Sequence, residues 1–169
     1  MTTLVIAKYE ENTKWSEGLK HKTFVVEKGV HLPNEGREPT SYLWYIIENY
    51  DTLKGKYFFM QANPFDHCPH TLEELNNTKG EFRWIGPEYI CNMMGRPQDT
   101  VNIKEFLDDC NVIYGGNSIR FNAACFFMLS ARRIKKHTKE QYKVIYKALL
   151  KNAKSPYAFE RCIEILWGK

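Results

Sequence analysis

Residues 56–67 read Lys56-Tyr57-Phe58-Phe59-Met60-Gln61-Ala62-Asn63-Pro64-Phe65-Asp66-His67. After the lysine, bulky apolar residues follow without interruption, which is typical of a short strand buried on both faces. The polar residues that come next mark the end of that strand, and Pro64 stiffens the loop that they form. We therefore predict a buried strand over residues 56–60 whose carboxyl end carries residues 61–67.

The sequence before this stretch alternates between strand and helix patterns. Residues 4–7 and 23–26 are short apolar runs, so we predict two more buried strands. Residues 41–50 have apolar side chains at helical spacing, and Pro39 or Ser41 is expected to start this helix. Alternating strands and helices predict an α/β fold with a mainly parallel sheet covered by helices.

The rest of the chain contributes further helices. Helix starts are predicted at Thr71, Asn102, Thr138 and Ser155. The first three are followed at the third position by a Glu or Gln, which is the spacing of a capping box. Residues 118–129 look like strand and turn, whereas residues 78–101 are rich in Gly and Pro and indicate no definite element. We expect one compact domain over residues 1–169.

Composition excludes several classes of protein. Hydrophobic residues make up 43% and charged residues 26% of 169 residues, which excludes a disordered chain, a coiled coil and a collagen. No window reaches 18 apolar residues, so we expect no membrane span, and the amino-terminal residues lack the pattern of a secretory signal. The five cysteines are scattered and odd in number, which favours reduced thiols in a soluble cytoplasmic protein over a disulfide framework.

Positive charge is concentrated in one segment. Residues 131–154 contain nine Lys or Arg and one acidic residue, whereas the formal net charge of the whole chain is +4. Such a segment can attract phosphate-bearing ligands or nucleic acid. The alternative is an ordinary solvated helix face, as most lysine runs are.

The predicted strand ends suggest where a ligand would bind. In open α/β sheets, ligands collect at the carboxyl ends of the strands, which here are residues 8–11, 28–29 and 61–67. Tyr9 is suited to stack on a base, and Glu11 to accept hydrogen bonds from a ring nitrogen or a ribose hydroxyl. The alternative is that these residues are ordinary polar residues at the end of a strand.

Three segments resemble a known family. Asn34-Glu35-Gly36-Arg37-Glu38, the run from Gln61 to His67, and Glu160-Arg161 with Trp167 are similar to segments of a family of small proteins of unknown function. Members occur in fungi, bacteria and large viruses, and they look like minimal glycosyltransferases of the GT-A type. The resemblance covers nearly the whole chain and is most specific between Asn34 and His67. For a viral member, the expected location is the host cytoplasm.

The resemblance implies a fold, an activity and a donor site. The fold would be GT-A-like, and the protein would move a sugar from a nucleotide-sugar donor to a hydroxyl of a glycan or a modified nucleobase. The implied donor-binding residues are Lys8, Tyr9, Glu11, Asn34, Gly36, Arg37, Gln61 and Asn63. From the sequence, Arg37 is suited to bind a phosphate through its planar guanidinium, and the alternative is a surface Arg–Glu pair that enters a helix.

One departure from the GT-A pattern concerns the metal. GT-A enzymes hold a divalent cation with a D-x-D motif, and this register is occupied here by Gln61 and Asn63. Amides are neutral and weaker ligands for Mn²⁺ or Mg²⁺. Either Asp66 and His67 supply the metal ligands, or arginine and lysine alone neutralise the diphosphate. A third interpretation is that the loop of Asp66 and His67 only caps the next helix.

Glu160 is the first candidate for the catalytic base, and Asp66 is the second. Glu160 lies about 100° around the last helix from the apolar stripe of Phe159, at the border of the buried face. A partly buried carboxylate with a raised pKa is suited to accept a proton from an acceptor hydroxyl. The alternative is that Glu160 and Arg161 form only a polar border of this helix.

Two other functions remain open. With the same fold, the basic segment predicts an acceptor in modified DNA. Alternatively, loss of the acids at Gln61 and Asn63 predicts a degenerate transferase that binds a sugar, a nucleotide, a nucleic acid or a protein without catalysis.

Overall fold

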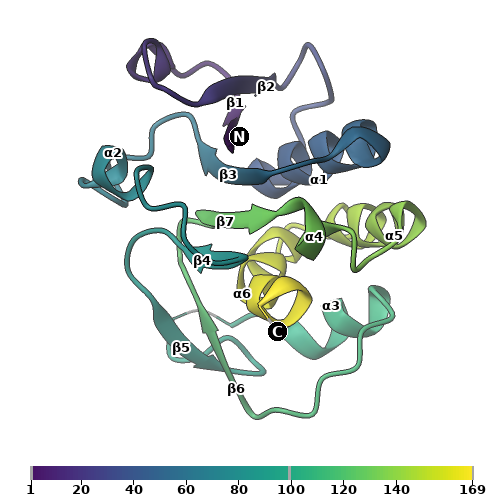
Figure 1. The fold of residues 1–169 in the computed structure, drawn as a ribbon. Helices are drawn as coiled ribbons and strands as arrows, with labels where there is room; N and C mark the ends of the chain where they lie inside the picture. The colour runs from purple at the N-terminus through teal and green to yellow at the C-terminus, as the bar shows by residue number, and fades with distance from the viewer. Residues whose placement is uncertain (1, 99, 169) are drawn as a thin grey trace.

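A five-stranded sheet with the strand order β2-β1-β3-β7-β4 runs through the centre of the molecule (Figure 1). The computed structural model describes residues 2–98 and 100–168. The strands are β1 (Thr2–Lys8), β2 (Lys22–Glu27), β3 (Lys56–Gln61), β4 (Phe82–Trp84) and β7 (Phe127–Ser130). Strand β1 pairs in parallel with β2 and β3, whereas β7 runs antiparallel to β3 and β4.

The sheet is therefore mixed but mostly parallel, and the chain is a single α/β domain. Four strands share one direction and only β7 is reversed. The three strands predicted from apolar runs are β1, β2 and β3, and each prediction is confirmed to within two residues at either end. Strand β4 lies in the segment 78–101, for which the sequence indicated no element.

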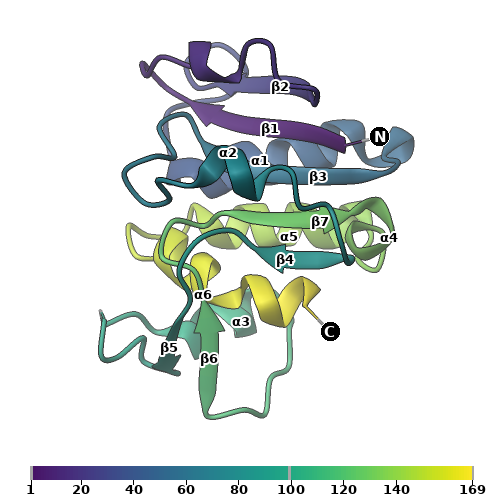
Figure 2. The ribbon, with the colours of Figure 1, turned by 60° about the vertical axis from the view of Figure 1, so that its left-hand side comes forward.

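Helices cover both faces of the sheet unequally (Figure 2). Helices α1 (Arg37–Asn49), α5 (Lys139–Leu149) and α6 (Ser155–Trp167) lie on one face, and the short α2 (Thr71–Glu74) lies on the other. Helix α3 (Ile103–Asp109) packs on α6, and α4 (Ala131–Ile134) directly follows β7. A second sheet of β5 (Tyr89–Asn92) and β6 (Ser118–Phe121) packs against α6.

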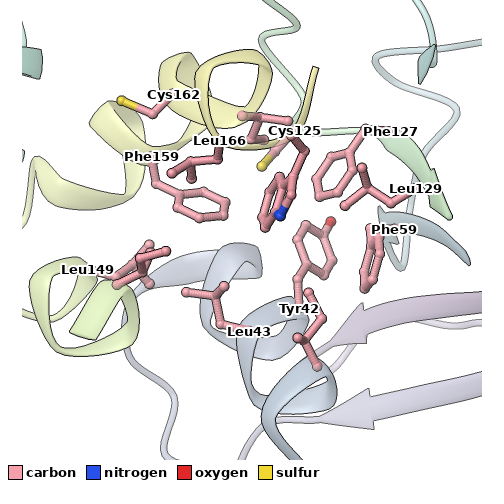
Figure 3. Packing of buried hydrophobic residues seen from close by; sticks show 14 of the residues in the cluster. Tyr42, Leu43, Phe59, Cys125, Phe127, Leu129, Leu149, Phe159, Cys162 and Leu166 are labelled. Atoms are coloured by element: carbon pink, nitrogen blue, oxygen red, sulfur yellow. The ribbon is translucent and has the colours of Figure 1, made fainter. Parts of the chain in front are cut away.

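The two faces explain why β3 is apolar from Tyr57 to Met60. In β3, Tyr57 and Phe59 point into the larger core with α1, α5 and α6, whereas Phe58 and Met60 point into the smaller core. Alternate side chains of a strand point to opposite faces, so a strand covered on both sides needs apolar residues at every position. In the larger core, the Phe59 and Phe127 rings stack at 5.1 Å between centroids (Figure 3).

Helix starts follow the predicted caps in most cases. Thr138 and Gln141 form a complete capping box at α5, and the Asn102 side chain accepts a hydrogen bond from the Glu105 N–H at α3. At α2 the predicted capping box is wrong: Thr71 is the first helical residue, and its hydroxyl donates to the Cys68 carbonyl.

Helix α1 begins earlier than predicted. It starts at Arg37 rather than at Pro39 or Ser41, because Gly36 adopts φ 64° and turns the chain directly into the helix. Pro39 falls within the first turn, where its missing N–H costs nothing.

All five cysteines are buried free thiols, as their scattered positions predicted. Within residues 2–98 and 100–168, no helix has the length and apolar character needed to cross a bilayer.

Candidate functional site

Two adjoining cavities lie at the carboxyl ends of β1, β2 and β3. The strand-end cavity, of about 210 Å³, is lined by the ends of these strands and the loop before α1. The helix cavity, of about 310 Å³, extends from there to α6 and the turn before β7. Both cavities are lined by Arg37, Glu38 and Gln61, so one ligand can occupy both. A ligand was predicted from the sequence at these carboxyl ends of the strands.

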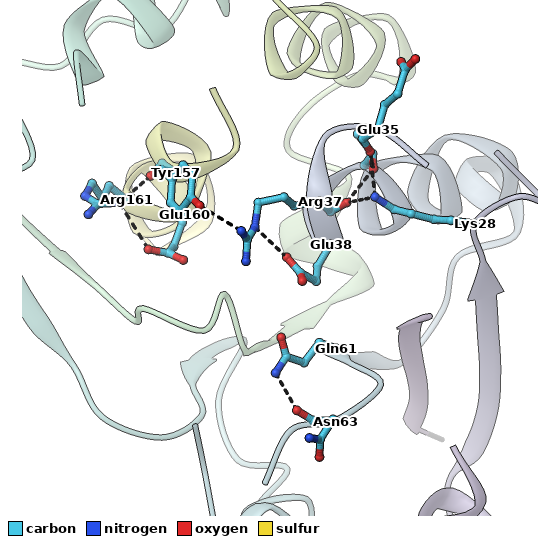
Figure 4. Close-up of polar contacts among 10 residues, drawn as sticks. Lys28, Glu35, Arg37, Glu38, Gln61, Asn63, Tyr157, Glu160 and Arg161 are labelled. Atoms are coloured by element: carbon cyan, nitrogen blue, oxygen red, sulfur yellow. Dashed lines mark hydrogen bonds and ion pairs between the residues drawn. The ribbon is translucent and has the colours of Figure 1, made fainter. Parts of the chain in front are cut away.

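The turn at Gly36 presents Arg37 to both cavities. Gly36 and Arg37 both have left-handed backbone conformations, with φ of 64° and 53°. A Cβ atom on Gly36 would lie 2.3 Å from Cγ2 of Thr40, so the close approach of this turn to α1 requires glycine. The Arg37 guanidinium donates to the Tyr157 hydroxyl at 2.9 Å and lies 3.5 Å from the Glu38 carboxylate (Figure 4).

The side chain of Lys28 holds this turn in place. It lies at the end of β2 and is only 6% exposed. Its Nζ donates to the carbonyl oxygen of Glu35 at 2.7 Å and to that of Arg37 (Figure 4). Burial lowers the pKa of Lys28 to about 8, and the nearby Glu38 carboxylate opposes this shift. The sequence identified Lys28 only as a strand end, and a single lysine directly after a buried strand was the available signal.

Glu160 lies in the wall of the helix cavity. Its side chain is 14% exposed, and its carboxylate lies 3.3 Å from Nη1 of Arg161. Burial raises the pKa of Glu160 from 4.5 to about 8; Arg161 and Arg37 oppose this shift, and Glu38 adds to it. The partly buried position and raised pKa expected from the sequence are therefore present. The catalytic role itself stays a prediction.

Arg161 and Tyr157 line the same cavity, and neither was predicted from the sequence to be a site residue. Arg161 is 3% exposed, donates to the Tyr157 carbonyl at 2.8 Å and lies 4.6 Å from the Phe121 ring centroid. It therefore holds a fixed positive charge beside Glu160. The spacing of Tyr157, Glu160 and Arg161 places all three on one side of α6, a pattern that the sequence contains.

The turn between β6 and β7 forms the opposite wall. Asn122 is fully buried, and its Nδ2 donates to the carbonyls of Ile85 at 2.8 Å and Pro87 at 2.7 Å. Its Oδ1 accepts a hydrogen bond from the Ala124 N–H at 2.9 Å. These bonds fix Ala123 and Ala124, which line the helix cavity. The sequence indicated a turn here but not its place in the site.

The structure brings together most of the donor-binding residues implied by the resemblance. Lys8, Tyr9, Glu11 and Asn34 line the strand-end cavity beside Arg37. The Glu11 carboxylate accepts a hydrogen bond from the Tyr9 N–H at 2.8 Å. Two implied residues do not line a cavity: Gly36 acts through its turn, and Asn63 points to Asp66.

The proposed metal ligands are not grouped. Gln61 lines both cavities, but its Nε2 donates to the Asn63 carbonyl at 2.6 Å. Asn63 donates to the Asp66 carboxylate at 2.7 Å, and Asp66 lines neither cavity, whereas His67 lines the helix cavity. Within the described part of the chain, no three His, Cys, Asp or Glu residues are placed to hold a metal ion. The assignments of Asp66 as a base and of Asp66 and His67 as ligands stay predictions.

The basic segment 131–154 is partly neutralised. At least four of its nine cations form ion pairs with acidic residues elsewhere in the structure or within the segment. These cations are Arg132, Lys139, Lys143 and Lys151. These pairs leave both interpretations of the segment, a phosphate-binding surface and a solvated helix face, as predictions.

Comparison with known proteins gives one family similarity. The sequence model of a family described as a protein of unknown function (DUF3431) matches residues 4–81, which include most of β1 and all of β2, β3 and α1. This stretch supplies the strand-end cavity and Arg37. No curated protein and no solved structure matches the chain significantly.

Proposed function

We propose that this protein is a glycosyltransferase of GT-A-like fold that moves a sugar from a nucleotide-sugar donor to a hydroxyl acceptor. One observation carries the proposal. A partly buried carboxyl group with a raised pKa, that of Glu160, lines a cavity together with Arg37 at the carboxyl ends of parallel strands. Perturbed titratable groups in a cavity are typical of catalytic sites.

In this proposal, the donor extends from the strand-end cavity into the helix cavity. Its nucleoside lies in the strand-end cavity, where Tyr9 and Glu11 contact the base or ribose. Its diphosphate lies at the junction, beside Arg37. The guanidinium has several N–H groups in a plane and is suited to bind phosphate oxygens. The sugar then reaches the helix cavity and Glu160.

The transfer requires one proton acceptor and one leaving-group site. The acceptor hydroxyl oxygen forms a bond with the anomeric carbon, and the bond from that carbon to the diphosphate oxygen breaks. The nucleoside diphosphate leaves with the electron pair, and the hydroxyl proton passes to the Glu160 carboxylate. Arg37 stabilises the negative charge that grows on the leaving group. Glu160 must be ionised before the reaction, although burial favours its neutral form.

A panel of nucleotide sugars tests the proposal through donor hydrolysis and transfer to glycan acceptors. We expect turnover of at least one donor by the wild-type protein and a loss of about 100-fold or more in Glu160→Gln, as is typical when a proton-transfer group is removed. Glu164→Gln is the matched control, because Glu164 lies one turn further along α6 and pairs with Arg120 outside the helix cavity. Full activity of Glu160→Gln would refute its role. Donor binding without any turnover would instead indicate a binding module.

A binding measurement with duplex DNA at several salt concentrations distinguishes the two classes of acceptor. A modified-DNA acceptor requires binding to duplex DNA that weakens steeply with salt, because each phosphate contact releases counterions. At least four cations of the basic segment are paired with acidic residues of this chain, which favours a glycan acceptor, and we expect no salt-dependent DNA binding.

A further inference from the structure

The D-x-D register of this chain does not fit a divalent cation. Mn²⁺ and Mg²⁺ prefer anionic oxygen ligands, and Gln61 and Asn63 supply neutral amides. Both side-chain nitrogens already donate within the loop, Gln61 to the Asn63 carbonyl and Asn63 to the Asp66 carboxylate. The Asp66 carboxylate is thereby directed to its own loop rather than to either cavity. Residues 61–67, at the carboxyl end of β3, therefore contain a single carboxylate, that of Asp66, and it already accepts a hydrogen bond from Asn63.

Each of the two carboxylates that line the helix cavity lies beside an arginine. Glu38 lies 3.5 Å from Nε of Arg37, and Glu160 lies 3.3 Å from Nη1 of Arg161 (Figure 4). Arg161 is buried, and if it moved away, the Glu160 carboxylate would lose its ion-pair partner. A divalent cation that used both carboxylates would have to displace these guanidinium groups.

Two cations are instead placed where a diphosphate would lie. Arg37 and Lys28 both line the strand-end cavity, and the Arg37 side chain is 55% exposed, so it is accessible to a ligand. Lys28 uses two of its three N–H groups on the carbonyls of Glu35 and Arg37. Because one of these bonds goes to the backbone carbonyl of Arg37, the Lys28 ammonium and the Arg37 backbone hold each other in position. The pair is held in place before any ligand arrives.

We propose that Arg37 and Lys28 take the place of the divalent cation, so that the site binds a nucleoside diphosphate without metal. This inference rests on the proposed function, since it names the groups that neutralise the donor. Lys28 has two roles: it contributes a positive charge to the wall of the strand-end cavity, and its bonds to the two carbonyls position the backbone of Arg37.

Isothermal titration with uridine and guanosine diphosphate tests the inference. Each is titrated in EDTA and again in excess Mn²⁺. We expect the affinity of the nucleotide that binds to agree within about threefold between the two conditions. Arg37→Gln should weaken binding by about ten- to 100-fold in EDTA, because a charge-assisted hydrogen bond is lost, and Arg37→Lys should recover part of this loss.

Arg132→Gln is the matched control. Arg132 follows β7 next to the start of β3, at the end of the sheet opposite to Gln61, and it pairs there with Glu81. The same loss of one positive charge should leave nucleotide affinity unchanged. Lys28→Met is measured alongside, with circular dichroism to check its fold. If this variant does not fold, the Arg37 variants still decide the question.

The outcomes separate this inference from the proposed function. Binding that requires Mn²⁺ would overturn the inference and leave the transferase proposal intact. Equal affinity in Arg37→Gln and wild type would also overturn it. Binding of neither nucleotide in either condition would overturn the inference, whereas the panel of nucleotide sugars decides the transferase proposal separately. Metal-independent binding with no turnover of any nucleotide sugar would support the inference and refute the transferase activity.

Discussion

The partly buried carboxyl group of Glu160 leads to a prediction about the stability of the protein that does not depend on any substrate. We expect Glu160→Gln to make the protein more stable than wild type at alkaline pH. Glutamine has nearly the same shape but cannot ionise, so it removes the cost of a negative charge in the wall of the helix cavity. It also removes the ion pair with Arg161, which only partly offsets that cost, because burial is the larger cause of the raised pKa. A residue retained at a cost to stability is expected where it serves catalysis.

The sign and size follow from the shift in the pKa. Burial raises the pKa of Glu160 from 4.5 to about 8 in the folded protein, so the folded state binds this proton more tightly than the unfolded state. The resulting stabilisation is complete below about pH 4.5 and is lost as the pH rises through about 8. Between about pH 6 and about pH 9, the wild-type protein should lose about 3 kcal/mol that the glutamine variant keeps.

Urea unfolding of both proteins at these two pH values measures the difference. Other titrating groups, such as Lys28, are the same in both proteins, so their contributions cancel in the comparison. Glu164→Gln is again the control: Glu164 is paired with Arg120 at 2.6 Å, and its replacement should change the free energy of unfolding equally at both pH values. If wild type and Glu160→Gln lose stability in parallel, then the carboxyl group is not desolvated and the reasoning about the site is wrong.

Three further predictions concern the same site. Transfer by the wild-type protein should increase as the pH rises through about 8, the pKa of Glu160, and a rate profile that is flat across this range would contradict its role as a base. Asn122→Ala should lower the free energy of unfolding by about 3 kcal/mol in urea, because it leaves the Ile85 and Pro87 carbonyls without their donor, and a loss below about 1 kcal/mol would show that water replaces these bonds. Gly36→Ala should lower the free energy of unfolding in urea by about 2 kcal/mol or more, because the added Cβ would contact Thr40 and the left-handed backbone disfavours alanine. An unchanged free energy of unfolding would mean that the turn can relax.

Local sequence was sufficient for the elements that depend on local patterns. The apolar runs of β1, β2 and β3 were recognisable because both faces of the sheet are covered, so the middle of each strand is apolar. The start of α5 was recognisable because Thr138 and Gln141 satisfy each other's backbone groups within one turn. Parallel strands further implied that their carboxyl ends meet at one edge of the sheet. The general place of the cavities followed from this.

Elements stabilised by distant partners were not recognisable in this way. Strand β4 has only three residues and exists because it pairs with β7, more than forty positions later. The reversed direction of β7 likewise depends on its pairing with β3. Neither segment has a local pattern that specifies its neighbour, because strand pairing is decided by packing over long sequence separations.

The sequence by itself determined which residues could do chemistry and roughly where the strands would deliver them. Only the tertiary structure decided which of them meet. Arg37 contacts Tyr157 across 120 positions of the chain, and Glu160 acquires its raised pKa from burial, whereas Asp66 is held by Asn63 and lines neither cavity. The physical reason is that identity and spacing are local properties, but burial, charge pairing and pKa depend on neighbours that the folded chain brings from far away.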